Sequence, residues 1–148
     1  MMHRVNEHLA WGDVWSVVEA AESFDSVLNV GREIKDYALP GIDYKMMYFD
    51  DVEPFPYDDI WECVLWIDEK ITAGKKVYVH CYYGNSRSVS TVIAYLHHQG
   101  MDFDDACDLI VRLKPRETVL GEYVDAPLSI RPWFRRDWPE FVKGKGVA

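Results

Sequence analysis

Residues 76–99 constrain the fold of this chain more than any other segment, because they join a strand, a loop and a helix without a break. Residues 76–80 are mostly β-branched and aromatic, which is typical of a buried strand. Residues 88–99 are expected to form a helix that ends at Gly100 and buries Val89, Val92, Ile93 and Leu96. A strand that leads directly into a helix is the building unit of an α/β domain.

Further strands and helices are predicted on both sides of this segment. We expect strands at residues 26–31 and 44–49, and helices at 13–21, from Asp58 or Asp59 to Gly74, and at 104–114. The tail from Glu117 is expected to be partly helical and to be anchored by Trp133, Phe134 and Trp138. The sequence therefore predicts one α/β domain over residues 1–148, with a central, mostly parallel sheet flanked by helices.

Composition excludes several classes of protein. Hydrophobic residues make up 49% of the chain, enough for a packed core, and the net charge of −9 argues against binding to nucleic acid or to an anionic membrane. No apolar run approaches the roughly 20 residues of a membrane span, and residues 1–13 lack the apolar core of a signal peptide. Three widely spaced cysteines suit a reducing compartment better than a disulfide framework. We expect a cytoplasmic protein.

The loop between the strand and the helix reads His-Cys-Tyr-Tyr-Gly-Asn-Ser-Arg-Ser from His80 to Ser88. Five residues separate Cys81 from Arg87, so the loop can curl until its amide groups converge on one anion, and Gly84 frees the backbone to do so. The following helix N-terminus and the Arg87 fork complete a phosphate-binding loop. The same groups acidify a thiol, which predicts that Cys81 is a thiolate at neutral pH. Ser88 can donate to the sulfur, and His80 is expected to shape the loop.

This stretch resembles the His-Cys-x5-Arg-Ser/Thr signature of the protein tyrosine and dual-specificity phosphatases, and the resemblance extends to residues 9–12, 27–30 and 76–79. The resemblance implies a phosphocysteine intermediate on Cys81, no metal or other cofactor, and an aspartic acid upstream as general acid. Asp50 matches that acid, because it lies 31 residues before Cys81 at the end of a predicted strand. Asp51 is the alternative, one residue further on.

The loop residues also indicate a substrate class. The expected substrate-binding residues are Tyr82, Tyr83, Gly84, Asn85, Ser86 and Arg87, and apart from Arg87 they add no cation. Acidic residues are expected around the mouth of the loop, namely Asp51, Glu53, Asp58 and Asp59. A polyanionic lipid or RNA end is disfavoured by such a field. We expect a phosphorylated protein or peptide as partner, carrying phosphotyrosine and also phosphoserine or phosphothreonine.

Other interpretations remain open. The chain could be a phosphate-recognising pseudophosphatase, although nucleophile, arginine and acid are all present, or a phosphatase of a non-protein phosphoester. Arsenate reductases and sulfurtransferases also use reactive cysteines in anion-binding loops. Cys63 and Cys107 lie in amphipathic helical patterns and are expected in the core. A basic cluster of Arg131, Arg135 and Arg136 is expected to form surface ion pairs.

Overall fold

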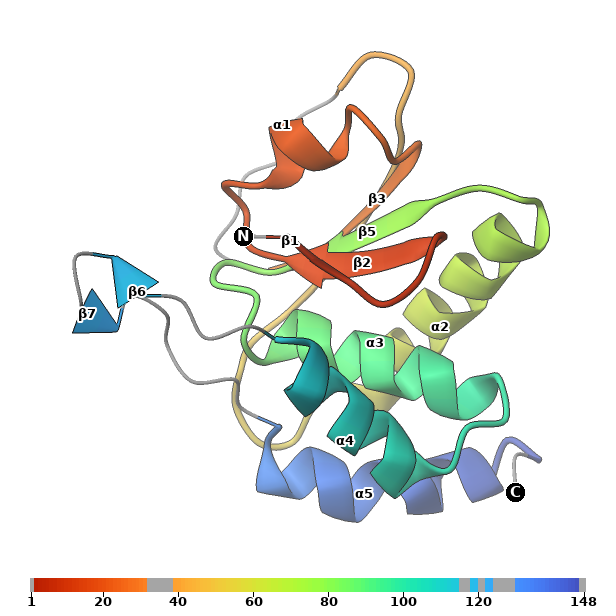
Figure 1. Ribbon diagram of the computed structural model, residues 1–148. Coiled ribbons are helices and arrows are strands. Elements are labelled where there is room, and N and C mark those ends of the chain that lie inside the picture. Colours follow the sequence, from red (N-terminus) through yellow and green to blue (C-terminus); the bar gives the residue numbers. More distant parts are fainter. Residues whose placement is uncertain (1, 32–38, 115–117, 120–121, 124–129, 147–148) are drawn as a thin grey trace.

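A five-stranded sheet runs through the centre of the molecule (Figure 1). The computed structural model describes residues 2–31, 39–114, 118–119, 122–123 and 130–146. The strands lie in the order β1-β2-β5-β3-β4. Their bounds are β1 Met2–Arg4, β2 Leu9–Gly12, β3 Ser26–Gly31, β4 Asp43–Phe49 and β5 Val77–His80. Only β1 is antiparallel to its neighbour among these strands, so the predicted α/β fold with a mostly parallel sheet is confirmed.

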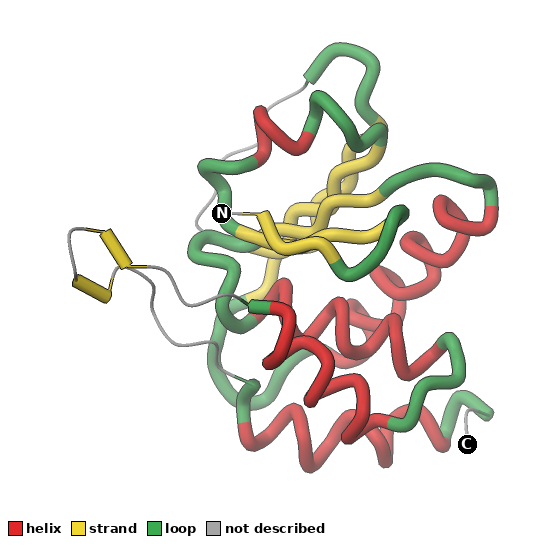
Figure 2. The backbone as a smooth tube through the Cα atoms, viewed as in Figure 1, coloured by secondary structure: helices red, strands yellow, loops and turns green. Residues whose placement is uncertain are grey.

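Helices cover the two faces of the sheet unequally. The short α1 (Val17–Ala20) lies on one face, and the four longer helices lie on the other (Figure 1). These are α2 (Tyr57–Thr72), α3 (Arg87–His98), α4 (Phe103–Leu113) and α5 (Pro132–Lys143). The tube view shows the same separation of helices from strands (Figure 2). A two-stranded pair, β6 (Thr118–Val119) with β7 (Glu122–Tyr123), lies apart from the sheet.

Side chains of the central strands alternate between two cores, as the pleat of a strand requires. In β5, Val77 and Val79 join the large core under α2 to α5, whereas Tyr78 joins the smaller core under α1. The helix α3 is buried along nearly its whole length, because it lies between the sheet and the helices α2 and α4. The strand β5 and the helix α3 on either side of the loop are therefore both deeply buried.

Two predicted element boundaries were wrong. Residues 13–16 form a turn instead of a helix, because the Asp13 carboxylate accepts a hydrogen bond from the amide of Ser16 (2.8 Å) and holds the chain outside the helical path. Neither Asp58 nor Asp59 caps α2, which begins at Tyr57 after Pro56 with no side-chain cap and has both acids within its first turn. The strand β1 was not predicted.

The C-terminal prediction falls partly outside the described residues, which omit 115–117, 120–121 and 124–129. The helix α5 confirms that the tail is helical in part. Phe134 and Trp138 are fully buried against the large core, and Trp133 is half-buried. The tail is therefore anchored as expected.

Three loops that matter for chemistry leave the same edge of the sheet. The carboxyl ends of β2, β4 and β5 lie there because these strands are parallel, linked through β3. Residues 13–16 follow β2, residues 50–56 follow β4, and residues 81–86 follow β5. Ligands of open α/β sheets bind at this edge.

Candidate active site

The loop of residues 81–86 joins β5 to α3 and holds the cysteine of the signature. Cys81 is buried, with 2% of its surface exposed, and its Sγ lies 3.2 Å from the Oγ of Ser88 in the first turn of α3. Arg87 is also buried and donates from its guanidinium to the carbonyl of Phe49 (3.2 Å), at the end of β4. The structure thus places the Cys81 sulfur against the Ser88 hydroxyl, whereas the Arg87 guanidinium contacts the end of β4.

Gly84 makes the tightest backbone contact of the loop. Its φ is +76°, and a Cβ atom at this position would lie 2.5 Å from the carbonyl carbon of Gly12. The Gly84 carbonyl also accepts a hydrogen bond from the indole of Trp11 (3.2 Å). A side chain is excluded by both sterics and conformation, so glycine fixes the loop against the end of β2.

His80 is held as a neutral side chain. Burial lowers its pKa to about 4, although its hydrogen bond to the Cys81 carbonyl opposes the shift. Its Nδ1 lies 3.2 Å from that carbonyl, so Nδ1 carries the proton and donates. The ring also stacks on Tyr78, with centroids 5.8 Å apart. These contacts fit a residue that shapes the loop.

One side of the loop is held by what we call the ion-pair rim, which consists of Asp51, Ser86 and Arg131. The Asp51 carboxylate accepts hydrogen bonds from the Ser86 hydroxyl (2.8 Å) and from Arg131 Nε (3.0 Å), and Arg131 Nη2 binds its second oxygen. Arg131 Nε also lies 3.1 Å from the Ser86 hydroxyl. The rim joins the segment after β4, the phosphate loop and the residue before α5.

The charge of Asp51 is fixed by these contacts. Partial burial alone would raise its pKa, but the hydrogen bonds from Arg131 and Ser86 and the charges of Arg131 and Arg87 hold the pKa below its usual value. A general acid must carry a proton before it donates one. Asp50, which precedes it and directly follows β4, is exposed to solvent. The Asp51 carboxylate is thus occupied by its ion pair with Arg131.

Three of the four acidic residues expected around the loop are paired with cations, which reduces the net negative charge expected there. Besides Asp51, Glu53 pairs with Arg136 (2.6 Å) and Asp58 pairs with Lys145 (3.6 Å). These ion pairs depend on the tertiary structure, because the segment of residues 131–145, which includes α5, lies next to residues 51–58. Arg136 and Arg131 therefore form the ion pairs expected of the basic cluster. A further cation reaches the loop, because Lys114 donates to the side chain of Asn85.

The other side of the loop carries what we call the aromatic rim, formed by Trp15, Tyr82 and Tyr83. Ring centroids lie 5.1 Å apart for Trp15 and Tyr82, 5.9 Å for Trp15 and Tyr83, and 4.8 Å for the two tyrosines. Trp15 is 63% exposed and Tyr83 is 65% exposed. The loop is thus bordered by charge on one side and by exposed rings on the other.

The remaining cysteines are placed as core residues. Cys63 and Cys107 are buried, and burial raises the pKa of Cys63 to about 12 and that of Cys107 to about 11. No group of three or more potential metal-binding side chains occurs within the described part of the chain. Among the described helices, none is long and apolar enough to span a membrane.

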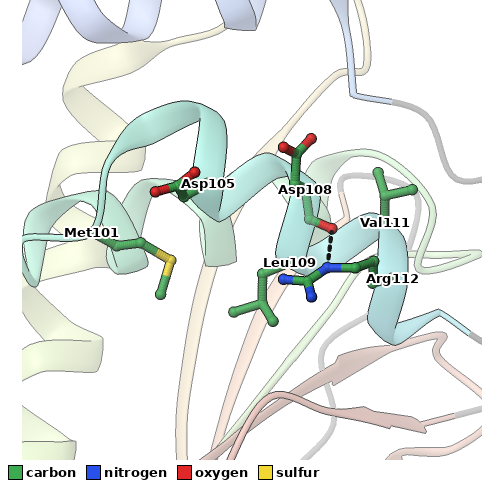
Figure 3. Close-up of a pocket in the computed structure, with 6 residues that line it drawn as sticks. All are labelled: Met101, Asp105, Asp108, Leu109, Val111 and Arg112. Atoms are coloured by element: carbon green, nitrogen blue, oxygen red, sulfur yellow. Dashed lines mark hydrogen bonds between the residues drawn. The ribbon is translucent and has the colours of Figure 1, made fainter.

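A hollow of about 650 Å³ lies elsewhere on the surface, along α4 (Figure 3). It is lined by Met101, Asp105, Asp108, Leu109, Val111 and Arg112. Its lining includes no residue of the phosphate loop or of either rim. This hollow is therefore separate from the loop that carries the predicted chemistry.

Comparison with known proteins agrees with the geometry. The family model for the dual-specificity phosphatase catalytic domain matches residues 12–123. The chain therefore belongs to the dual-specificity phosphatase family.

Individual relatives are more distant. The chain is 30% identical to mouse protein phosphatase Slingshot homolog 3 over 118 residues, which is 76% of this chain and 18% of that protein. It is 48% identical to Arabidopsis thaliana dual specificity protein phosphatase 1B over 50 residues, covering 33% of this chain and 30% of that protein. The chain thus spans less than a third of the length of these curated relatives.

Solved structures share the fold at low sequence identity. The structure of human DUSP28 superposes with a TM-score of 0.78 at 19% identity, covering 98% of this chain and 95% of that one. DUSP15 gives a TM-score of 0.76 at 23% identity, covering 95% and 86%. These likenesses establish the fold.

Sequence reasoning missed three residues of the site. Arg131 was identified as basic but assigned to the surface, and Lys114 was assigned to a helix end; neither lies near the loop in sequence. Trp15 was placed in a helix. The available signal for Trp15 was its position three residues after the end of a strand, at the edge of the sheet where ligands bind. No local pattern predicts the partners of Arg131 or Lys114.

Proposed function

We propose that this chain is a cysteine-dependent phosphatase that hydrolyses phosphomonoesters on proteins through a phosphocysteine intermediate on Cys81. Residues 1–148 would act as one catalytic domain. The observation that carries the proposal is the position of the Cys81 sulfur, which lies 3.2 Å from the Ser88 hydroxyl and one loop away from Arg87. The Ser88 hydroxyl can donate to this sulfur, and the loop that begins at Cys81 leads directly into the N-terminus of α3, which suits the binding of a phosphate next to a nucleophilic sulfur.

In the first step the Cys81 thiolate attacks phosphorus and forms an S–P bond while the P–O ester bond breaks. The Arg87 guanidinium binds two phosphoryl oxygens, and the amides of the loop bind the charge that builds up on them. Asp50 protonates the leaving oxygen, so that an alcohol or phenol departs instead of its anion. We assign this role to Asp50 because Asp51 is held as a carboxylate by Arg131.

In the second step a water molecule attacks the phosphocysteine. Asp50, now ionised, accepts a proton from that water as the O–P bond forms and the S–P bond breaks. The Ser88 hydroxyl donates to the departing sulfur and lowers the cost of its negative charge. Inorganic phosphate leaves, and both Cys81 and Asp50 return to their starting states. His80, neutral and bonded to the Cys81 carbonyl, keeps the loop in shape.

The substrate class follows from the rims of the loop. We propose phosphotyrosine, together with phosphoserine and phosphothreonine, because Tyr82 and Tyr83 directly follow Cys81 and can contact an aromatic phosphoester, and because the chain belongs to the dual-specificity phosphatase family. The names of the relatives support a protein substrate: Slingshot homologs and dual specificity protein phosphatases are named as protein phosphatases.

The decisive experiment is hydrolysis of para-nitrophenyl phosphate by the wild type and by Cys81→Ser, with a metal chelator present. We expect turnover by the wild type and its loss in the variant, with vanadate as an inhibitor of the wild type. Turnover retained by Cys81→Ser would remove the nucleophile assignment. Binding of vanadate without any turnover by the wild type would favour the pseudophosphatase alternative.

A further inference from the structure

The two proposed chemical steps use no side chain of the aromatic rim. Trp15 and Tyr83 each expose more than 60% of their surface, although large aromatic side chains are normally mostly buried. Their rings are not scattered, because both contact Tyr82 and one another with centroids 4.8 to 5.9 Å apart. A cluster of exposed apolar rings on a protein surface marks a site of interaction.

Trp15 is exposed but firmly held. It lies in the turn of residues 13–16, whose Asp13 carboxylate accepts from the amide of Ser16 (2.8 Å). The Asp13 carbonyl accepts from the hydroxyl of Tyr78 (2.6 Å), and the amide of Val14 donates to the carbonyl of Tyr82 (3.1 Å). A surface ring on a fixed turn loses little conformational freedom when a ligand covers it.

The aromatic rim is continuous with the phosphate loop. Tyr82 and Tyr83 follow Cys81 directly, and the contact of Gly84 with Gly12 ties the loop to the segment that carries Trp15. A phosphopeptide held by its phosphate in this loop therefore lies within reach of these rings. Two residues of extended chain span at most about 7 Å, so a side chain close in sequence to the phosphorylated residue can reach them.

We propose that the aromatic rim is a specificity subsite that binds a large apolar or aromatic side chain within two residues of the phosphorylated residue of a protein substrate. This inference rests on the proposed function. The rings offer apolar faces and edges without a charged group among them, which suits an aromatic or aliphatic side chain. A peptide is favoured over an anionic membrane because the chain carries a net charge of −9.

The test uses pairs of phosphotyrosine peptides that differ only by Phe or Ser at one position, with two positions scanned on each side of the phosphotyrosine. We expect one position at which Phe raises kcat/KM by about fivefold to tenfold, and we expect Trp15→Ala and Tyr83→Ala each to remove most of that preference. The matched control is Leu65→Ala, an exposed apolar residue on α2, which should keep it. A flat profile, or a preference that survives both rim substitutions, would overturn the subsite.

Two further measurements separate this inference from the function on which it rests. Turnover of para-nitrophenyl phosphate by the wild type tests the function alone. If that turnover is absent, the same peptide pairs are ranked by Kd on the wild type, where loss of the Phe preference in Trp15→Ala would still support the subsite. Binding of the wild type to phosphatidylcholine–phosphatidylserine vesicles that is lost in Trp15→Ala, with no peptide preference, would assign the rim to a membrane and refute the proposal.

Discussion

The two rims of the phosphate loop are held in place by different forces. The ion-pair rim joins three distant segments through charged side chains, with Asp51 and Arg131 separated by 80 residues in sequence. The aromatic rim is held by the backbone hydrogen bond from Val14 to Tyr82, by the hydrogen bonds that Asp13 accepts from Ser16 and Tyr78, and by the contact of Gly84 with Gly12, and its Trp15 and Tyr83 rings stay exposed. A rim held by an ion pair depends more strongly on pH and salt than a rim held mainly by hydrogen bonds and packing. The ion-pair rim is suited to position the neighbouring Asp50, the proposed general acid. The aromatic rim is suited to bind a side chain of the substrate.

The largest expected effect concerns Asp50, the proposed general acid next to the ion-pair rim. Asp50→Asn should lower kcat by about 10²- to 10⁴-fold for substrates with poor leaving groups, because the departing oxygen then receives no proton. The loss should be much smaller for activated aryl phosphates, whose leaving groups need no protonation. Steady-state kinetics over a series of phosphate esters with different leaving-group pKa values measures this dependence.

Asp51→Asn is the matched control for that series. It removes the neighbouring charge, and we expect a loss that is similar for good and poor leaving groups, because Asp51 holds the loop and transfers no proton. A leaving-group dependence in Asp51→Asn, with a flat profile in Asp50→Asn, would exchange the two roles.

Gly84→Ala, next to the aromatic rim, is expected to lower activity less than Asp50→Asn does. The new Cβ would meet the Gly12 backbone at 2.5 Å, so the loop must move. We expect a drop in kcat/KM of at least about tenfold, with a loss of stability of about 1 to 3 kcal/mol, measured by chemical denaturation. Gly41→Ala is the control, because Gly41 has the same φ of +76° but no atom within 4 Å of its Cβ position. Equal effects of the two substitutions would show that the positive φ alone causes the loss, and not the contact of Gly84 with Gly12.

The smallest effect is expected for the charge pair itself. A double-mutant cycle of Asp51→Asn and Arg131→Leu should give a coupling free energy of roughly 1 kcal/mol, as is usual for a partly exposed pair. Because the pKa of Asp51 is lowered below 3.8 in the folded chain, its contribution is complete above that value. It should be lost as the pH falls further through the folded pKa.

Thermal melting across pH measures this loss. The difference in stability between the wild type and Asp51→Asn should stay constant down to about pH 5 and shrink below about pH 4. The aromatic-rim variant Trp15→Ala should show no such trend. A difference between the wild type and Asp51→Asn that grew on acidification would contradict the assigned ion pair.

Local patterns were enough to predict the strand–loop–helix unit of the candidate site. The strand, the loop and the helix follow one another directly, so spacing within residues 76–99 determines that the Cys81 sulfur meets the Ser88 hydroxyl. The alternation of strands and helices likewise predicted the mostly parallel sheet. Both predictions use patterns that a single sequence displays, although the strands of the sheet pair between residues remote in sequence.

Contacts between remote residues were not predictable in the same way. Nothing near Asp51 indicates that Arg131 will return to it, because the route depends on the packing of Phe134 and Trp138 in α5. The helical pattern at residues 13–16 gave a wrong prediction, because the hydrogen bond from the Ser16 amide to the Asp13 carboxylate holds these residues in a turn. The rims, which distinguish this site from a bare phosphate loop, depended on the structure.

The burial of the two remaining thiols also bears on damage by peroxide. A sulfur oxidised to a sulfenic acid is protected when a nearby thiolate attacks it and closes a disulfide. Cys63 and Cys107 are buried, and their raised pKa values keep them protonated at neutral pH. Neither is equipped for that repair, so an oxidised Cys81 would depend on thiols supplied from outside the chain to regain its reduced form.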